Sequence, residues 1–546
     1  MAKASRTVSL LCLCYLVCLA LCLDPPQYTK SYRATGSIRL PYAEIVEPFT
    51  AYYDNVNNRS RIDYYNGVQK TIQLGPSKSA AFGVGYLVVP ISTQTVMNKY
   101  TCFQSNGSKG SPIEMTTIIP DLTKFKFVGT KVFGSELANT FQLITTEGKK
   151  VNTYTFWSST ADDRPLRYEM MGYDSLLGSH YDKYFVDYDS WVSPAVFTAE
   201  DFAVPGGMPC GDFPGPGQSS IHAVEFEPIK EFVHHYSAHV DEGFKTFKDV
   251  HNKKYKSHED EPRKHVFRQN LRYINSKNRA GLSYKLAVNH LSAHSSDEIR
   301  VMRGFRYSAR DHGGKAFPKH LLTTVDAPDQ WDWRLMGAVT PVKDQAICGS
   351  CWSFGTTGTI EGANFLKTGQ LVRLSQQELV DCSWGFGNNG CDGGEDFRAY
   401  KYLLANGGLS TEELYKPYEA IDSVCLKNKV KNVVQISNYT LLPQGDQNAL
   451  KIALYEKGPI SVAIDAAHKS FVFYSNGVYY EPECKSGPDD LDHAVLAVGY
   501  GVMNGQSYWL VKNSWSTYWG NSGYVLMSQK DNNCGVATAA SFVEIK

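Results

Sequence analysis

Two cysteines lie three positions apart in residues 344–358, DQAICGSCWSFGTTG, and either could supply a reactive thiol. The chain after residue 340 holds seven cysteines, and the unpaired member of an odd set in a disulfide-forming compartment is a candidate nucleophile. Cys351 and Trp352 are followed by SFGTTGTIEGANFLKTG, which carries helix signals and ends at a capping Gly369. Because a helix N-terminus lowers the pKa of a thiol, we expect Cys351 to be the nucleophile and Cys348 to form a disulfide.

A cysteine nucleophile also needs a base, and of the 14 histidines only His468 and His493 lie in this part of the chain. His493 stands at the entry to an apolar strand, LDHAVLAVGYG, whereas His468 is followed by a lysine, whose charge would disfavour protonation of the ring. His493 is therefore the expected base. Asn513, in VKNSWSTYWG, begins a turn after the next strand, from which its amide could fix the tautomer of His493.

These residues closely resemble the papain-like cysteine proteases over about residues 225–546, through Gln345, Cys348-Gly-Ser-Cys351-Trp352, His493 and Asn513-Ser-Trp515. The resemblance implies that Cys351 attacks the peptide carbonyl, that His493 carries the proton and that Asn513 orients His493. It also implies that Trp515 shields the last of these contacts from water. The side-chain amide of Gln345 and the backbone N–H of Cys351 would form an oxyanion hole, worth about 3 kcal/mol per donor. Such a reaction requires neither a metal nor a cofactor.

The same resemblance implies three disulfides that leave Cys351 free: Cys348 with Cys391, Cys382 with Cys425, and Cys484 with Cys534. Only eight residues separate Cys382 from Cys391, too few for the occluding loop that makes some relatives dipeptidases, so we expect an endopeptidase. The pocket for the second residue upstream of the cut would involve Glu395, Asp396, Ala463, Leu491 and Ala539. Relatives often carry apolar side chains in place of the two carboxylates. Either basic substrate residues are tolerated there, or both carboxylates point to solvent.

Upstream, six side chains recur at steps of 4, 4, 3, 4 and 4, which places them on one helical face: Glu259, Arg263, Phe267, Asn270, Ile274 and Asn278. By spacing alone, an ordinary amphipathic helix explains them equally well. Beside the protease motifs, all six positions resemble the ERFNIN inhibitory prosegment of cathepsin L-like members, which would make this segment an intramolecular inhibitor. The shorter motif that should follow, Gly-x-Asn-x-Phe-x-Asp, is degenerate here: Ala287, Asn289, Leu291 and Ala293.

The chain begins with Lys3 and Arg6 and an apolar run from Val8 to Leu23, a pattern typical of a secretory signal peptide. A membrane anchor is the alternative, but the run has 16 residues where a spanning helix needs about 20. We therefore expect the protein in the secretory pathway, in lysosomes or outside the cell. Three glycosylation sequons fit this route: Asn58, Asn106 and Asn438. A formal net charge of zero and the absence of a Lys/Arg run give no reason to expect nucleic acid as a partner. No later segment is long and apolar enough to predict a membrane span.

Strand-like alternation dominates residues 24 to 203, and the Gly/Pro-rich stretch PGGMPCGDFPGPG at 205–217 predicts an irregular break. We expect a signal peptide at 1–22, a β-rich domain at 23–203, a linker at 204–222, a prosegment at 223–326 and a catalytic domain at 327–546. Cys102 and Cys210 are expected to pair. The fold class is α+β, and the resemblance implies two catalytic lobes, one helical and one like a β-barrel.

The sequence thus predicts the zymogen of a secreted or lysosomal cysteine endopeptidase that acts on proteins or peptides. Its long N-terminal extension resembles that of certain insect haemocyte and digestive cysteine proteinases, in which the cleaved extension is retained as a second chain. The alternative is an adhesion, signalling or ligand-binding protein that acts through the β-rich domain. The intact set Gln345, Cys351, His493 and Asn513 argues against an inactive scaffold.

Overall fold

The computed structural model describes residues 23–92, 96–176, 178–212, 227–236, 238–309 and 312–546. The expected signal peptide at 1–22 and the linker residues 213–222 lie outside these ranges. The described residues form two compact units, one within residues 23–91 and 98–281 and the other within residues 92–97 and 282–546. Among the described residues, no helix is both long enough and apolar enough to cross a membrane.

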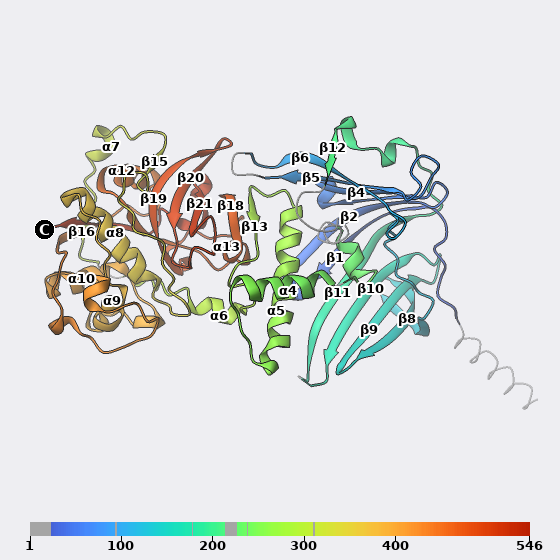
Figure 1. Ribbon diagram of the computed structural model, residues 1–546, viewed down its shortest axis with the longest axis horizontal. Helices are drawn as coiled ribbons and strands as arrows, with labels where there is room; N and C mark the ends of the chain where they lie inside the picture. Colours follow the sequence, from blue (N-terminus) through green and yellow to red (C-terminus); the bar gives the residue numbers. More distant parts are fainter. Residues whose placement is uncertain (1–22, 93–95, 177, 213–226, 237, 310–311) are drawn as a thin grey trace, which may run out of the picture. The chain divides into compact units, whose positions relative to one another are not determined.

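The N-terminal unit is built on one twelve-stranded sheet with the order β12-β6-β5-β4-β3-β2-β1-β11-β10-β9-β8-β7 (Figure 1). Its strands are β1 Tyr32–Leu40, β2 Ile45–Asp54, β3 Arg59–Tyr64, β4 Gln69–Leu74, β5 Val84–Ile91, β6 Lys99–Asn106, β7 Lys126–Phe133, β8 Glu136–Glu147, β9 Lys150–Ser159, β10 Pro165–Asp174, β11 Ser179–Val192 and β12 Cys210–Asp212. The expected β-rich character is confirmed. The alternating sequence explains the sheet, because successive side chains point to opposite faces.

Two hairpins show how local sequence fixes this topology. Gly134 begins the two-residue turn between β7 and β8, and Gly148 begins the turn between β8 and β9. Their φ angles of 61° and 60° lie in the left-handed region that such tight turns require and that glycine adopts without strain. The turns therefore set the register of three neighbouring strands.

The expectation that nothing regular runs through residues 205–217 is wrong for Cys210–Asp212. These residues form β12, which pairs in parallel with β6 and places Cys210 opposite Cys102. A disulfide joins these two cysteines. A short strand can form in a Gly/Pro-rich segment here because the covalent bond holds it against the edge of the sheet.

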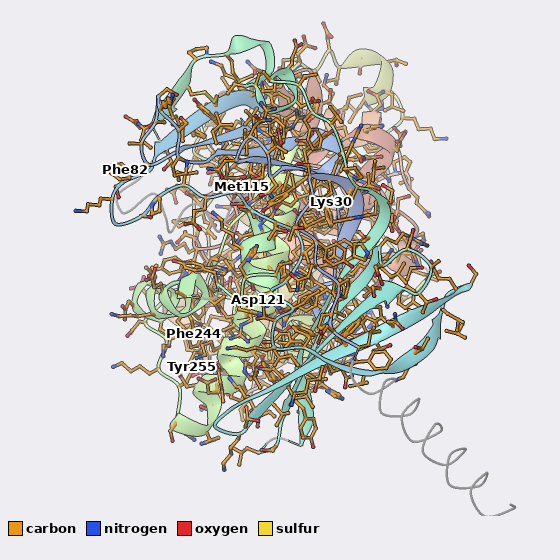
Figure 2. The ribbon with its side chains drawn as sticks, turned by 90° about the vertical axis from the view of Figure 1, so that its right-hand side faces the viewer. Lys30, Phe82, Met115, Asp121, Phe244 and Tyr255 are labelled. Atoms are coloured by element: carbon orange, nitrogen blue, oxygen red, sulfur yellow. A yellow bond between two sulfur atoms is a disulfide. The ribbon has the colours of Figure 1, made fainter. Side chains whose placement is uncertain are left out.

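Three helices belong to the same compact unit as this sheet: α3 Pro228–Phe232, α4 Ala238–Val250 and α5 Ser257–Arg279. Phe244 of α4 stacks on Tyr255, with ring centroids 6.2 Å apart, and Figure 2 labels both residues. Glu259 stabilises the start of α5 by accepting the backbone N–H of Lys256 at 3.1 Å. The division between the compact units falls after Gly281, inside the segment expected to be a single prosegment.

The C-terminal unit contains a ten-stranded sheet with the open order β13-β18-β21-β20-β19-β17-β22-β16-β14, with β15 paired to β19. Its strands are β13 Tyr284–Leu286, β14 Lys315–Ala316, β15 Trp331–Asp332, β16 Ile436–Leu441, β17 Ile460–Ile464, β18 Tyr474–Tyr479, β19 His493–Met503, β20 Gln506–Lys512, β21 Tyr524–Ser528 and β22 Ala540–Ile545. Its helices are α6 Ser296–Val301, α7 Leu321–Thr324, α8 Cys351–Thr368, α9 Gln376–Cys382, α10 Asp396–Asn406, α11 Glu412–Tyr415, α12 Gln447–Lys457 and α13 Lys469–Val472. The expected α+β class is confirmed, with an open sheet rather than a closed barrel.

Helix α8 packs closely on this sheet because it presents glycines to it. A Cβ at Gly358 would lie 2.6 Å from Cδ2 of Leu496 on β19, and one at Gly355 would lie 2.7 Å from Oγ of Ser461 on β17. Side chains at these positions would push the helix away from the strands. The glycines therefore hold the start of α8 close to the start of β19, where the candidate site lies.

Candidate active site

Cys351 is the first residue of α8 and is fully buried. The helix ends at Gly369, whose φ of 73° gives the expected left-handed cap. Free backbone N–H groups at the helix N-terminus favour negative charge on a sulfur placed there. Cys351 is the one cysteine outside a disulfide among the described residues.

His493 begins β19, and Asn513 follows the end of the neighbouring strand β20. Nε2 of His493 lies 2.8 Å from Oδ1 of Asn513. Because an amide oxygen only accepts, Nε2 carries the proton, and Nδ1 is left as the basic nitrogen. The backbone N–H of Ala494 donates to Sγ of Cys351 at 3.4 Å. The nucleophile and base predicted from the sequence are thus brought together.

Trp515 covers the imidazole. Its indole is fully buried, with its ring centroid 4.8 Å from that of His493 and an interplanar angle of 38°. Phe471 packs against both rings, with its ring centroid 5.5 Å from that of Trp515 and 6.5 Å from that of His493. The contact between His493 and Asn513 therefore lies in a largely apolar environment, where a hydrogen bond is stronger than in water.

Burial keeps both reactive groups neutral in this closed state. It raises the pKa of the Cys351 thiol to about 11, although N–H groups of Ala494 and Gly304 oppose the shift. It lowers the pKa of His493 to about 4, against the opposing effect of the Asn513 hydrogen bond. Loss of whatever covers the sulfur would move both pKa values back toward the range in which thiolate and imidazolium coexist.

The side-chain amide of Gln345 is fixed by three hydrogen bonds. Its Oε1 accepts from the hydroxyl of Ser514 at 2.6 Å, which orients the NH₂ group. Nε2 donates to the carbonyl oxygen of Cys348 at 2.7 Å and to that of Met302 at 2.8 Å. This NH₂ group is the donor expected in the oxyanion hole, and here a carbonyl of the upstream segment accepts a hydrogen bond from it.

That upstream segment, residues 282–309, is called the strap below. Phe305 forms a parallel bridge with Gly394. The N–H of Gly394 donates to the carbonyl of Gly304 at 2.9 Å, and the N–H of Arg306 donates to the carbonyl of Gly394 at 3.1 Å. The strap thus uses backbone hydrogen bonds of the kind that an extended peptide would make at this site.

Two further contacts hold the strap over the sulfur. Arg303 pairs with Asp492, the residue before His493, with 2.5 Å between nitrogen and oxygen. At Gly304 a Cβ would lie 1.8 Å from the carbonyl oxygen of Gly349. Only glycine fits at this point, because the two backbones are in direct contact.

The degenerate short motif lies in the strap and docks without a carboxylate. The amide of Asn289 donates to the carbonyl of Val472 at 2.8 Å, and the N–H of Ala287 donates to that of Phe473 at 2.9 Å. Leu291 and Ala293 are buried. The surviving asparagine therefore supplies the polar contact, and the substituted positions pack as apolar residues.

A cavity of about 290 Å³ adjoins the strap, and Phe305 and Tyr307 form part of its wall. Four of the five residues expected in a substrate pocket also line it: Glu395, Asp396, Ala463 and Ala539. Leu491 is not among the lining residues and packs instead in a hydrophobic cluster with Ala463. The strap therefore forms one side of this cavity in the zymogen.

Both carboxylates face protein rather than solvent, so the alternative in which they point to solvent is wrong. Glu395 has 1% of its surface exposed, accepts the N–H of Ser308 at 3.1 Å and pairs with Arg398 at 3.0 Å. Asp396 accepts from the hydroxyl of Ser541 at 2.5 Å. Burial raises the pKa of both, that of Glu395 to about 7.

Three disulfides brace this unit, and they join the pairs that the resemblance implied: Cys348–Cys391, Cys382–Cys425 and Cys484–Cys534. The first links the loop before α8 to the loop that carries Gly394. It therefore fixes the two backbone segments between which the strap lies.

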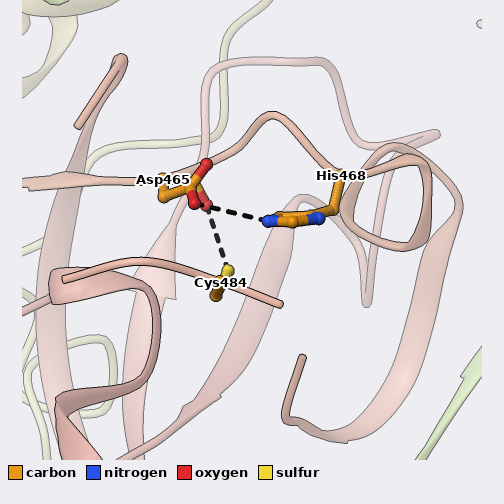
Figure 3. A group of neighbouring side chains, drawn as sticks. All are labelled: Asp465, His468 and Cys484. Carbon is orange, nitrogen blue, oxygen red and sulfur yellow. Dashed lines mark hydrogen bonds and ion pairs between the residues drawn. The ribbon is translucent and has the colours of Figure 1, made fainter. Parts of the chain in front are cut away.

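His468, the other histidine considered as a base, bonds Asp465 with 3.3 Å between Nε2 and Oδ2 (Figure 3). This contact raises the pKa of His468, so the expectation that the adjacent lysine disfavours protonation is wrong. Cys484 completes a group with metal-ligand spacing. Its sulfur is engaged in the disulfide with Cys534, so it offers no thiolate to a metal ion.

Comparison with known proteins agrees with this geometry. Residues 327–544 match the papain family of cysteine proteases, and residues 244–299 match the cathepsin propeptide inhibitor domain. The chain is 49% identical over 307 residues to digestive cysteine proteinase 1 of Homarus americanus, covering 54% of this chain and 92% of that protein. It is 42% identical over 326 residues to cathepsin L2 of Homo sapiens, covering 58% and 96%. The solved digestive procathepsin L2 proteinase from Tenebrio molitor larval midgut is 36% identical, with a TM-score of 0.52 and coverage of 56% and 99%.

Proposed function

The chain belongs to the papain family of cysteine proteases, as the zymogen of a cathepsin L-like endopeptidase, and we propose that Cys351, His493, Asn513 and Gln345 carry its reaction. The observation that supports this most directly is the N–H of Ala494 on the sulfur at the N-terminus of α8. It places the residue after His493 in contact with the nucleophile, while Asn513 holds the imidazole at 2.8 Å.

In the proposed reaction the Cys351 thiolate adds to the carbonyl carbon of the scissile peptide bond. Negative charge develops on the carbonyl oxygen, which accepts from the Gln345 amide and the backbone N–H of Cys351. The His493 imidazolium gives its proton to the departing amine, which leaves a thioester on Cys351. A water then adds to the thioester carbon, with neutral His493 taking its proton, and the acid product leaves as the thiolate returns.

The zymogen is inactive for a structural reason in this proposal. The Met302 carbonyl accepts a hydrogen bond from the side-chain amide of Gln345. The carbonyl of Gly304 and the N–H of Arg306 form hydrogen bonds with the backbone N–H and carbonyl of Gly394. Removal of the strap would free the donor and expose the sulfur in the same step. We place the maturation cut near Ala327, at the start of the region that matches the protease family.

The labelling of the thiol tests this proposal. We expect an epoxysuccinyl probe to modify Cys351 alone once the zymogen is brought to about pH 5, with adduct and peptide cleavage both appearing as the strap is lost. At neutral pH without acid treatment, labelling should be slow, because burial raises the pKa of the thiol to about 11.

Mass spectrometry of the adduct, run beside a peptidase assay, distinguishes the outcomes. Activity that persists after stoichiometric labelling of Cys351 would contradict the proposed nucleophile. Labelling of another site at the same rate would do the same. A folded, strap-free chain that neither labels nor cleaves would indicate that the protein acts by binding.

We also place the protein in the secretory pathway, with lysosomes or the extracellular space as its destination. We propose the same signal peptide, domains and linker, with the same boundaries, that the sequence predicts. Four disulfides suit an oxidising compartment. Of the sequon asparagines, Asn106 is exposed, and Asn58 and Asn438 are partly exposed, so glycans could be attached to them. Relatives named digestive proteinases and cathepsins support the same assignment.

We further assign the cavity beside Phe305 as the pocket for the second substrate residue upstream of the cut. Ala463, Ala539 and Leu442 lie outside the strap and make the pocket apolar enough for leucine or phenylalanine. Glu395 and Asp396 add carboxyl groups at its wall. A carboxyl whose pKa is raised is charged only above that pKa. Basic side chains should therefore be accepted better as the pH rises, while apolar ones should depend less on pH.

The prediction is a pH-dependent ratio of kcat/KM for otherwise identical peptides with arginine or leucine at that position. Between pH 5 and 7 the arginine-to-leucine ratio should rise by about fivefold to tenfold in the parent enzyme, the effect of roughly one added ion pair. In the Glu395→Gln, Asp396→Asn double variant, which preserves both side-chain shapes, the ratio should stay flat. An equally steep rise in the variant would show that neither carboxylate sets the preference.

A further inference from the structure

Helix α5 carries two stripes of side chains on opposite sides. The front stripe consists of the six positions matched to the prosegment motif, and its Phe267 packs on Phe244 and Phe247 of α4, with ring centroids 5.4 and 5.2 Å away. The back stripe recurs at steps of 4, 3, 4 and 3: His265, Gln269, Arg272, Ser276 and Arg279. At about 100° per residue, the centres of the two stripes differ by roughly half a turn of the helix.

The C-terminal end of the back stripe is bound to strand β2. Arg279 donates from Nε to Oε1 of Glu47 at 2.7 Å and from Nη2 to Oε2 at 2.8 Å, a bidentate pair. Ser276 donates to the same carboxylate at 2.7 Å, and the hydroxyl of Tyr65 lies 2.6 Å from that of Ser276. The side chains of Arg279 and Glu47 are only 6% and 1% exposed.

About two turns earlier, the stripe is bound to strand β11. Arg272 donates to Asp182 at 2.7 Å and to Glu231, at the end of α3, also at 2.7 Å. Gln269 donates to the same Asp182 oxygen at 3.0 Å. The guanidinium also lies over the ring of Phe232, 5.1 Å from its centroid, so α3, α5 and the sheet meet at one buried charge.

The contact continues along the helix and through α3. His265 stacks on Tyr181 of β11 with ring centroids 5.1 Å apart. In α3, Phe232 packs 5.1 Å from Tyr184. Ahead of that helix, Glu227 accepts from Gln73 of β4 at 2.9 Å. Contacts with the sheet therefore extend over about four turns of α5 and include the segment that leads into it.

A solvated polar face is the ordinary explanation for such a stripe, but its burial argues against it. Charged side chains are rarely this buried unless they are paired, and an unpaired partner left in such a place is strongly unfavourable. Here two arginines, seven residues apart, each meet a buried carboxylate of the sheet. The protease motif accounts for the front stripe only, and the back stripe is matched to the N-terminal sheet.

We propose that the N-terminal sheet is a receptor for the back stripe of α5, and that it keeps residues 227–281 bound after the chain is cut between prosegment and catalytic region. The partner of the extra domain is then a segment of its own chain. When the strap is removed, the helical prosegment stays on the sheet instead of diffusing away or leaving with the protease. This assignment does not depend on which residues perform catalysis.

The test uses the full-length zymogen with Cys351→Ser, so that it cannot process itself, and an affinity tag on the N-terminal domain. Cleavage sites for a site-specific protease are introduced at 213–217 and at 324–327. After cutting, the tagged domain is immobilised, and the half-lives of the prosegment and catalytic fragments on it are followed by mass spectrometry. We expect the prosegment fragment to outlast the catalytic fragment by about tenfold or more. Departure of the two fragments together would overturn the proposal.

Variants assign the retention to the back stripe. The double variant Glu47→Gln, Asp182→Asn should shorten the half-life of the prosegment fragment by at least about tenfold. The complementary variant Arg272→Gln, Arg279→Gln leaves the sheet unchanged, so it gives the same readout even if the first variant misfolds. Lys150→Gln is the matched control, since it removes a more exposed pair between β9 and Glu261 of the same helix. If the arginine variant is retained as long as the control, the proposal is wrong.

Discussion

The Cys351→Ser protein, freed of its strap by an added protease, should hydrolyse peptides at least about 10⁴-fold more slowly than the parent enzyme. The serine is nearly isosteric with the buried cysteine, so the fold should be unaffected, but its hydroxyl ionises far less readily than a thiol. The residual rate would come from the Gln345 donor and from substrate binding. The measurement is kcat/KM on one fluorogenic peptide, with thermal unfolding of both proteins.

The matched control is Thr359→Ser, about two turns further along α8. Its hydroxyl donates to the carbonyl of Pro459 at 2.6 Å, and serine retains that donor. Activity of this control should stay within about twofold of the parent. Because serine retains the hydrogen bond, the stability of the protein should change little. Substantial peptidase activity in folded Cys351→Ser protein would rule out the proposed reaction.

Gly304→Ala should weaken latency without acid treatment. The added Cβ would lie 1.8 Å from the carbonyl oxygen of Gly349. The two backbones cannot move apart to relieve this clash without breaking the bridge at Gly394. Overpacking of this kind costs about 1–3 kcal/mol, which raises the population with a displaced strap by roughly five- to 150-fold. We therefore expect probe labelling of Cys351 at neutral pH to be about tenfold faster or more than in the parent.

Arg300→Ala serves as the control for this variant, because Arg300 lies four residues upstream in the same strap with 71% of its side chain exposed. Labelling of the control should match the parent. Labelling of Gly304→Ala at the parent rate would show that the strap tolerates a side chain there. The backbone contact would then not be what closes the site.

Local structure around the site could be predicted from the sequence because each element has its own signal. Gly369 marks the end of α8, and the apolar run after His493 marks β19, as observed. The contact between His493 and Asn513 could not be derived in this way. Twenty residues separate the two, and their proximity depends on the pairing of β19 with β20. The resemblance to a known family supplied that information.

The strap contacts were not predictable, because they are made mainly by backbone atoms. Nothing in the side chains of Met302 or Phe305 indicates that one offers a carbonyl to Gln345 and the other bridges Gly394. Leu491 was misplaced for a related reason. An apolar residue near a pocket packs equally well behind its wall, as it does here.

The back stripe of α5 was missed because polar helical faces are usually hydrated. Arg272 and Arg279 carry no mark of burial in the sequence, and their partners Asp182 and Glu47 are 90 and 232 residues away. The available signal was the regular 4-3-4-3 spacing of long polar side chains opposite a motif that already accounted for the other face. A helix with two ordered stripes predicts two partners.

The division of the chain after Gly281 also has a consequence for biosynthesis. Translation proceeds from the N-terminus at roughly 5–20 residues per second, and domains generally fold as units in that order. The unit that holds α5 is complete in sequence before any of residues 282–546 has been made, so the last residue follows it by roughly 13 to 50 seconds. The prosegment helix can thus reach its folded partner on the sheet first. The protease region is then synthesised after its inhibitor helix has become ordered.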